Sequence, residues 1–191
     1  MISATVRRAT AAAATTALAG LLAAGCGSEK AGEAAVPEGW RTLDAQQVSV
    51  AYPKGFAELA ENKLPKSATA EADLMEDGKA VARIVVQTRF MQTGDLDMAV
   101  AGADAAYEFG GTSKDKEDVK VPGTGRATRI GHEFKSSGAD HSPPRGTDMT
   151  AVDVVGMDKD DKPWVVRVIA PKGKLSRDDV DRIVGSVKVT G

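Results

Sequence analysis

Several segments of this chain alternate apolar and polar residues with the period of two that is typical of β-strands. The segment 48–52 has this alternation and is followed by a Pro and a Gly, so we expect a half-buried strand there. The segments 68–75 and 80–90 predict two further strands, and the Asp-Gly pair at 77–78 is typical of a tight hairpin turn between them. Residues 57–66 predict no more than a helical turn.

The segment 93–109 has a helical period instead. Its apolar positions recur on one face of a helix, at Leu96, Val100, Ala103 and Tyr107. Thr93 or Asp95 can cap the amino end, and the two glycines at 110–111 are typical of a helix end. Residues 112–118 are mostly charged and predict a loop.

The last third of the chain returns to the strand pattern. Strands are predicted over 119–121, 127–134, 149–157 and 164–170. In the second of these, Thr128, Ile130, His132 and Phe134 share one face. A polar loop over 136–148 is long enough to carry a function, and a charged hairpin loop joins the last two strands.

The final element is predicted to be a helix that begins after Ser176. Ser176 and Asp179 have the spacing of a capping box, with Asp in place of the usual Glu. The apolar stripe of this helix consists of Val180, Ile183, Val184 and Val187. The order of strands, helix, strands and helix predicts an α+β fold, in which helices pack on one mainly antiparallel sheet.

The first 25 residues have the layout of a secretory signal peptide. Arg7 and Arg8 form a positive region, residues 9–24 carry no charge, and Gly25 is the small residue before the cleavage point. This apolar run of 16 residues is shorter than the roughly 18–20 that cross a bilayer, and no other charge-free run is as long, so we expect no transmembrane helix in the mature chain. General secretion is favoured over the twin-arginine pathway, because the apolar pair and Lys usual after the arginines are absent.

The signal segment ends in the residues LAAGC, which resemble the lipobox of bacterial lipoproteins. Cys26 closes this motif and is the only cysteine of the chain. The resemblance implies that Cys26 carries a diacylglyceryl group, becomes the first residue of the mature protein and anchors it at the extracytoplasmic face of the cell membrane. Two acyl chains suffice for stable anchoring, at about 0.8 kcal/mol per buried methylene. The alternative is an unmodified Cys beside an ordinary cleavage site.

The chain is thus expected to divide into a signal peptide (1–25), a lipidated Cys with a flexible tether (26–39) and a single globular domain (40–191). Removing two arginines with the signal peptide changes the net charge from −2 to −4. No basic patch stands out, which argues against nucleic acid as a partner. With Cys26 committed to lipid, no disulfide is possible and the domain depends on its hydrophobic core.

Both ends of the domain resemble the PsbP-like family. The opening is similar in residues 40–43, WRTL, and 48–56, VSVAYPKGF, and the ending in residues 165–170, VVRVIA, and 183–187, IVGSV. The domain is also similar to actinobacterial lipoproteins of the LpqN type, and the bias toward Ala, Gly, Asp, Val and Arg is typical of a high-GC genome. The resemblance implies a curved antiparallel sheet with helices on both sides, an α/β/α sandwich. It also implies a mostly non-enzymatic binding or accessory role, without a catalytic motif to carry over.

Few residues of the sequence could carry chemistry. The two histidines, His132 and His141, have no metal-ligand spacing with each other or with Cys26, so we expect neither a metal nor a cofactor. Asp158 and Asp160 begin a calcium-loop spacing, but the Gly and Glu that such a loop needs are absent. The sequence contains no nucleophile elbow and no complete phosphate-binding glycine motif.

We therefore expect an envelope lipoprotein with a non-catalytic binding or accessory domain. Its partners would be the membrane, through the lipid on Cys26, and an envelope protein or small ligand, with a contact surface on His132, His141 and Arg145. Two alternatives stay open. A carrier of a small ligand or lipid needs an apolar cavity of about 300 Å³ or more. A hydrolase that uses His132 or His141 needs that ring in a concave pocket, within hydrogen-bond reach of a carboxylate or Ser.

Overall fold

The computed structural model describes residues 36–107, 111–139 and 142–190, which all belong to one compact unit. The strands are β1 (Arg41–Ala45), β2 (Val48–Tyr52), β3 (Phe56–Glu58), β4 (Ala70–Glu76), β5 (Lys79–Thr88), β6 (Gly111–Val119), β7 (Ala127–Lys135), β8 (Asp148–Met157), β9 (Pro163–Pro171) and β10 (Lys188–Val189). The helices are α1 (Leu96–Ala105), α2 (Arg177–Gly185) and a short 3₁₀ turn, η1 (Glu61–Lys63). Cys26 and the predicted signal peptide lie outside the described residues, so these assignments stay predictions.

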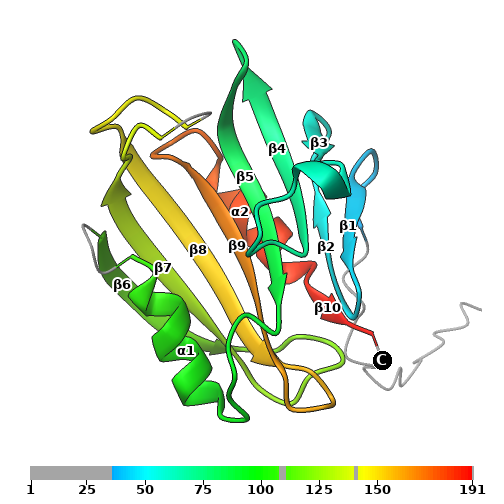
Figure 1. Ribbon diagram of the computed structural model, residues 1–191. Coiled ribbons are helices and arrows are strands. Elements are labelled where there is room, and N and C mark those ends of the chain that lie inside the picture. Colours follow the sequence, from blue (N-terminus) through cyan, green and yellow to red (C-terminus); the bar gives the residue numbers. More distant parts are fainter. Residues whose placement is uncertain (1–35, 108–110, 140–141, 191) are drawn as a thin grey trace, which may run out of the picture. The chain divides into compact units, whose positions relative to one another are not determined.

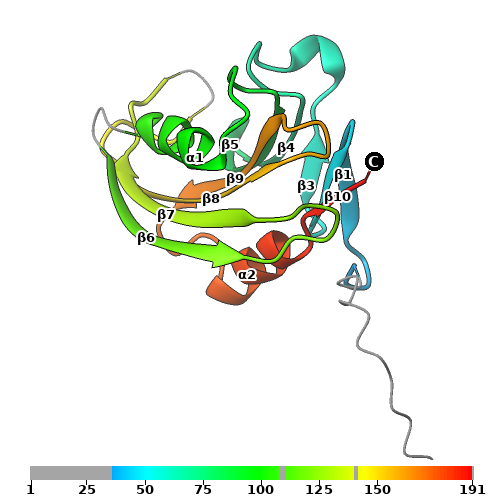
Figure 2. The ribbon, with the colours of Figure 1, turned by 90° about the horizontal axis from the view of Figure 1, so that it is seen from below.

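Seven strands form the main sheet, in the order β3-β4-β5-β9-β8-β7-β6, and all neighbouring strands are antiparallel. α1 packs on one face of this curved sheet, over β7, β8 and β9 (Figure 1). α2 packs on the opposite face, so that the sheet lies between the two helices (Figure 2). The predicted α+β class, with helices on both sides of a mainly antiparallel sheet, is confirmed.

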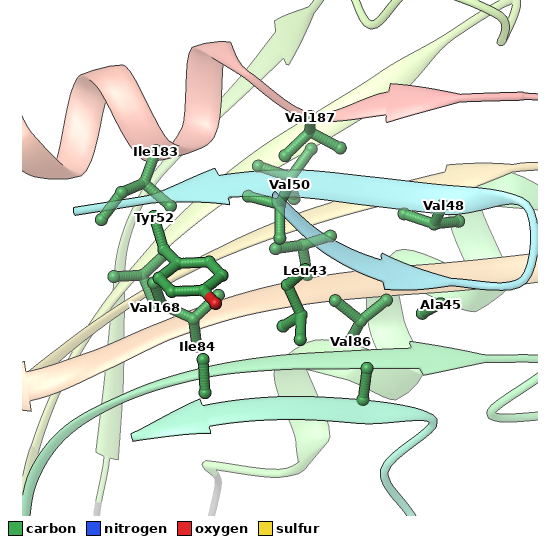
Figure 3. Close-up of a cluster of buried hydrophobic side chains, with 14 of the residues drawn as sticks. Leu43, Ala45, Val48, Val50, Tyr52, Ile84, Val86, Val168, Ile183 and Val187 are labelled. Atoms are coloured by element: carbon green, nitrogen blue, oxygen red, sulfur yellow. The ribbon is translucent and has the colours of Figure 1, made fainter. Parts of the chain in front are cut away.

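The main hydrophobic core lies between the main sheet and a second sheet, which has the order β1-β2-β10 (Figure 3). The alternation of β2 predicted burial of one face only. In the structure β2 is buried at all five positions. The reason is that α2 covers the second face of β2: the N–H of Ala51 donates to Ser186 Oγ at the end of α2, at 2.8 Å. Ser186 also donates to the carbonyl of Ile183, at 2.7 Å, which ties the helix end to the strand.

A smaller hydrophobic core lies under α1. Ala99 and Ala103 are fully buried there, against apolar side chains of β7, β8 and β9. The predicted cap is confirmed, since Asp95 accepts a hydrogen bond from the N–H of Met98 at 2.9 Å. The helix is shorter than the predicted segment 93–109, because it ends at Ala105 and the structure does not describe residues 108–110.

The cap predicted for the last helix is also confirmed. Ser176 Oγ accepts a hydrogen bond from the N–H of Asp179 at 3.0 Å and donates to the carboxylate of Asp179 at 2.7 Å. The stripe of this helix faces the main core, where Ile183 is buried. Val187, which was predicted to belong to the stripe, is buried there too but follows the helix, which ends at Gly185. The turn predicted at 77–78 is present too, with positive φ angles at Asp77 (49°) and Gly78 (76°).

The loop predicted over 112–118 is wrong, because these residues belong to strand β6. Among the described strands β6 lies at the edge of the sheet and pairs with β7 alone, and most of its side chains are exposed. Charged side chains are compatible with such a strand because both its faces border solvent, and they protect its open edge from pairing with other chains. The strand predicted over 119–121 is also wrong, because only Val119 belongs to a strand and it is the last residue of β6.

We predict that Gly156 cannot be replaced by Ala without loss of stability. Gly156 lies opposite Trp164 in the β8–β9 pair, and an added Cβ would lie 2.3 Å from Cζ2 of the buried indole ring. Overpacking of this kind lowers the free energy of unfolding by about 1–3 kcal/mol. Urea denaturation followed by circular dichroism measures the change. Gly125→Ala is the matched control, because nothing lies within 4 Å of its added Cβ. Equal stability of the two variants would contradict this packing.

Candidate functional site

The face of the main sheet that α1 partly covers carries charged side chains on six strands. The strand pairing places them in two neighbouring rows across the sheet. The first row contains, from β4 to β6, Asp73, Arg83, Ile169, Ala151, His132 and Ser113. The second row contains Glu71, Val85, Arg167, Asp153, Ile130 and Lys116. We call the ionisable members the charged band; they are Glu71, Asp73, Arg83, Arg167, Asp153, His132 and Lys116.

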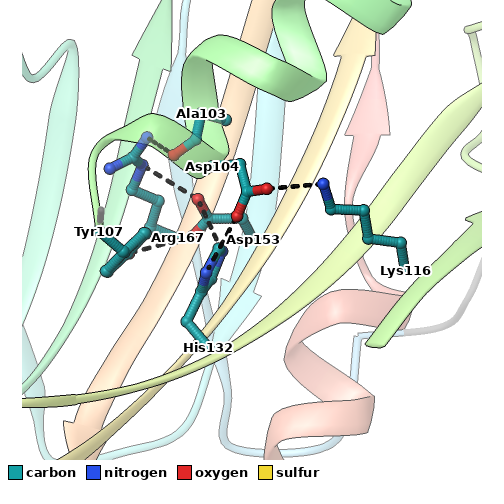
Figure 4. Close-up of polar contacts among 7 residues, drawn as sticks. All are labelled: Ala103, Asp104, Tyr107, Lys116, His132, Asp153 and Arg167. Atoms are coloured by element: carbon teal, nitrogen blue, oxygen red, sulfur yellow. Dashed lines mark hydrogen bonds and ion pairs between the residues drawn. The ribbon is translucent and has the colours of Figure 1, made fainter. Parts of the chain in front are cut away.

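His132 lies in the middle of β7, directly beneath α1, and its side chain has no exposed surface (Figure 4). Its Nδ1 lies 3.6 Å from Asp104 Oδ1, and its Nε2 lies 3.8 Å from Asp153 Oδ2. Neither distance is a hydrogen bond. Burial lowers the pKa of His132; Asp104 opposes this effect, and Arg167 and Lys116 add to it. The ring is therefore held neutral at neutral pH.

Tyr107, just after α1, contacts both His132 and Arg167 of the charged band. Its ring stacks on His132 with the centroids 4.0 Å apart, and the guanidinium carbon of Arg167 lies 5.4 Å from its ring centre. Its hydroxyl donates to Asp153 Oδ1 at 3.3 Å. Burial, with Asp153 next in effect, raises the pKa of Tyr107, so the phenol stays a protonated donor.

Asp153 is the most deeply buried acid of the band, with no exposed surface. Its Oδ2 lies 3.4 Å from Nε of Arg167, whose side chain is 14% exposed. Burial raises the pKa of Asp153 to about 7, although Arg167 acts in the opposite direction. Near neutral pH this acid is therefore only partly ionised, and it compensates only part of the positive charge of Arg167.

The other end of the band carries two acids on one strand. Glu71 and Asp73 alternate on the same face of β4, and a carboxylate oxygen of each lies 3.9 Å from Nε of Arg83. Burial and the neighbouring Asp73 raise the pKa of Glu71 to about 7, and burial also raises the pKa of Asp73. Burial thus makes both acids harder to ionise, although Arg83 acts in the opposite direction on each.

A cavity of about 300 Å³ opens on this face, beyond the carboxyl end of α1. We call it the helix-end cavity. Arg83 and Arg167 line it from the sheet, and Ala106 and Tyr107 line it from the end of α1. Apolar side chains of β5, β7, β8 and β9 supply much of the rest, and residues of the 136–147 segment contribute the last wall.

Hydrogen bonds hold the 136–147 wall in place. The buried Ser136 hydroxyl donates to the carbonyl of Pro143 at 2.7 Å, and its backbone N–H donates to the carbonyl of Thr147 at 2.9 Å. The N–H of Gly146 donates back to the carbonyl of Ser136 at 2.8 Å. The loop predicted to carry a function thus forms a braced side of the cavity, in the part that the structure describes.

A second hollow, of about 880 Å³, lies on the far side of Arg83. Glu71 and Asp73 line it together with the segment from Ala57 to Pro65. Its charged lining is mixed, because Glu58 and Lys63 contribute as well. Arg83 lines both this hollow and the helix-end cavity.

The structure separates the residues that the sequence had grouped into one contact surface. His132 is buried beneath α1, and Arg145 is exposed on the 136–147 segment. His141 and Cys26 lie outside the described residues. A contact surface that includes Arg145 stays a prediction, but the His132 ring cannot supply exposed area to it.

The described residues show no arrangement of nucleophile and base. The ring of His132 is inaccessible and has no hydrogen bond to a carboxylate or Ser, so the geometry required of a hydrolase is not met at this residue. The hydroxyl of Ser136, which lines the cavity, donates to a backbone carbonyl. Within the described ranges there is also no group of three or more His, Cys, Asp or Glu side chains placed to hold a metal ion.

The charged band was missed by sequence reasoning, although a signal was present. Arg83, Asp153 and Arg167 are each the single charged residue in the interior of a mostly apolar strand, since the other charges of β5 and β8, Lys79 and Asp148, are the first residues of their strands. Charged residues are almost never fully buried unless they are paired, so an isolated charge in an apolar strand indicates a partner. The partners themselves could not be read from the sequence, because they depend on the order of the strands.

We predict that replacing Asp153 by Asn reduces the pH dependence of stability. Between an unfolded pKa of about 4 and the folded pKa of about 7, the folded protein binds a proton at Asp153 that the unfolded chain has released. The free energy of unfolding therefore falls as pH rises through this interval. Because Asn does not titrate, the stability of Asp153→Asn relative to wild type should increase by about 2 kcal/mol between pH 5 and pH 7.

Urea denaturation of both proteins at each pH measures this change. Asp148→Asn is the control, because Asp148 is an exposed acid whose pKa is lowered by its hydrogen bond to Lys135. Its difference from wild type should stay constant over the same interval. A constant difference for Asp153→Asn would mean that the acid is already ionised at pH 5 in the folded protein.

No family model matches the sequence, and no curated protein matches it. Among solved structures, the fold is similar to cyanobacterial PsbP (CyanoP) from Synechocystis, with 10% identity, a TM-score of 0.50, and coverage of 79% of this chain and 92% of that chain. It is similar to the Ran-binding protein Mog1p of Saccharomyces cerevisiae, with 12% identity, a TM-score of 0.50, and coverage of 78% and 95%. At such identities the likeness shows the fold alone.

The structure of LpqN, described as involved in cell envelope biogenesis of Mycobacterium tuberculosis, is also among the matches. It has 13% identity and coverage of 82% of this chain and 81% of that chain, but its TM-score of 0.42 is too low to carry an argument. The chain spans about half (48%) of the length of a Bacteroides thetaiotaomicron protein that it matches with 10% identity and a TM-score of 0.48. The likeness to CyanoP shows that the domain has a PsbP-like fold, and an actinobacterial source stays an expectation.

Proposed function

We propose that this chain is a lipid-anchored envelope protein whose domain binds a small ligand in the helix-end cavity, without catalysing a reaction. The lipobox and Cys26 support the anchored location. The cavity is the observation that carries the binding role, since its volume of about 300 Å³ lies at the lower end of known ligand sites. Of the two alternatives left open by the sequence, this favours the carrier over the hydrolase.

The lining of the cavity supports this role. Ligand sites are mostly apolar, with a few fixed polar groups that orient the ligand. Here Ile169 and Met149 are among the apolar residues, and Arg83, Arg167 and Lys135 are the charged ones. The positions of both arginines are fixed by ion pairs within the charged band, so the site is preorganised.

The inaccessible histidine supports a non-catalytic role. A general base must reach the proton that it removes, directly or through one water molecule. The His132 ring has no exposed surface, and Asp153 beside it has none either. Both groups instead fix the positions of Tyr107 and Arg167, which reach the cavity.

The anchor is tested by Cys26→Ala in the natural host. This substitution removes the sulfur that accepts the lipid, so the protein should move from the membrane fraction to the soluble fraction. Neither of the two described α-helices is long and apolar enough to cross a membrane. Ala23→Val, a change within the signal segment that keeps the cysteine, is the control and should leave the protein on membranes. Unchanged fractionation of Cys26→Ala would contradict the anchor.

The cavity is tested by filling it. Ala106 is exposed, lines the cavity and follows the last turn of α1, so Ala106→Trp should block ligand entry at little cost in stability. Fragment screening by NMR should show binding to the wild type and its loss in this variant. The matched control is Ala105→Trp, because Ala105 is also exposed but is not among the described residues that line the cavity. Equal fragment binding by both variants would place the ligand site elsewhere.

A further inference from the structure

We infer that residues 59–68 form a pH-sensitive strap over two buried acids, Glu71 and Asp73. The strap is closed while these acids hold protons and is released when they ionise. This inference goes beyond the proposed binding function and does not depend on it. Its basis is a loosely packed segment that faces two buried carboxyl groups across a hollow, at the β3–β4 edge of the main sheet.

Hydrogen bonds near both ends hold the strap to the main sheet. The N–H of Leu59 donates to the carbonyl of Glu71 at 2.9 Å, and Nε2 of Gln87 donates to the carbonyl of Ser67 at 2.9 Å. The flanks are fixed as well, because β3 pairs with β4 and the N–H of Thr69 donates to a carbonyl of β5 at 2.8 Å. The strap, with η1 in it, lies on the same side of the main sheet as α1 (Figure 1 and Figure 2).

Between these ends the strap is loosely packed. The structure describes all of residues 59–68, and none of them is buried. Its two leucines, Leu59 and Leu64, lie outside both described hydrophobic cores. Segments with few buried apolar contacts open locally at a lower free energy than the core of a domain.

Two hollows border the strap. The second hollow, of about 880 Å³, is lined by the strap together with Glu71 and Asp73. A third hollow, of about 660 Å³, is lined by the strap, by Glu71, and by β1 with the turn that follows it. The strap can therefore leave the sheet without breaking a packed apolar interface, and its release would expose both acids to water.

Both acids are costly to ionise while the strap is closed. The side chains of Glu71 and Asp73 are only 3% and 10% exposed, and Asp73 Oδ1 has no hydrogen-bond partner among the described residues. Burial raises the pKa of Glu71 to about 7 and also raises the pKa of Asp73, although Arg83 opposes both effects from 3.9 Å. Release of the strap returns both carboxyl groups to water, where their pKa values are about 4.

The other charged residues that line these two hollows are at least partly exposed. Among the described residues they are Asp44 of β1, Glu58 of β3, Glu61, Lys63 and Lys66 of the strap, and Arg83 of β5. Glu71 and Asp73 are thus the buried acids of the group. The closed state holds protons that the released state gives up, so the closed state is favoured at low pH and is lost as pH rises toward 7.

Hydrogen exchange of the full chain carrying Cys26→Ala, measured by NMR between pH 5 and pH 7, tests the strap. Its reporter is the N–H of Leu59, whose bond to Glu71 breaks on release. After correction for the intrinsic pH dependence of exchange, the opening constant should rise at least tenfold over this interval. An acid whose pKa is about 7 when closed and about 4 when released contributes about tenfold per pH unit between these values. Amides of the β5–β9 pair report global unfolding and should stay more protected at both pH values.

Glu71→Gln and Asp73→Asn imitate the protonated acids. In the double variant the opening constant at Leu59 should therefore agree within about twofold between pH 5 and pH 7. Glu61→Gln is the matched control, because Glu61 is an exposed acid on the strap itself. This variant should keep the pH dependence of the wild type.

Three outcomes would overturn the inference. The first is a Leu59 N–H that is unprotected at pH 5, or that opens equally at both pH values. The second is an unchanged pH dependence in the double variant. The third is exchange of Leu59 in parallel with the amides of the β5–β9 pair, which would mean that the strap opens only when the whole domain unfolds. None of these results concerns the helix-end cavity, which Ala106→Trp tests separately.

Discussion

The contact between Asp153 and Arg167 is the interaction on which the described site depends. A carboxylate without exposed surface is stable only with partners, and Arg167 and Tyr107 are those partners. Through them one acid connects β8 to β9 and to the end of α1, while His132 stacks on Tyr107 from β7. Removal of either partner would leave a buried polar group uncompensated, so the side chains hold each other in position.

The two faces of the main sheet differ in the side chains that they carry. One face packs on the small sheet and α2 and is apolar, so it supplies most of the stability of the domain. The other face buries alanines under α1 and, where α1 ends, presents Arg83 and Arg167 of the charged band to the helix-end cavity. The helix is therefore both a cover for the polar side chains and one wall of the binding site, and its length decides where the cavity opens.

Similarity to CyanoP and Mog1p gives the fold of this domain without its function, since one fold serves many functions. The proposed role rests instead on two features that are independent of each other. The lipobox concerns where the protein resides, and the cavity concerns what it binds. The anchored location can be wrong while the binding role is right, and the reverse also holds.

The sequence by itself determined the α+β class, the strands β4, β5, β8 and β9, the caps of both helices and the turn at 77–78, because period, capping residues and Asp-Gly pairs act locally. It misassigned β6, whose exposed charges resemble a loop until an edge position is known. The charged band was visible only as single charges within apolar strands. Which charges meet is decided by the strand order β4-β5-β9-β8-β7, in which β5 and β9 lie side by side although more than 70 residues separate them. Only the tertiary structure brings Arg83 next to Arg167, because electrostatic contacts depend on distance in space and not on position along the chain.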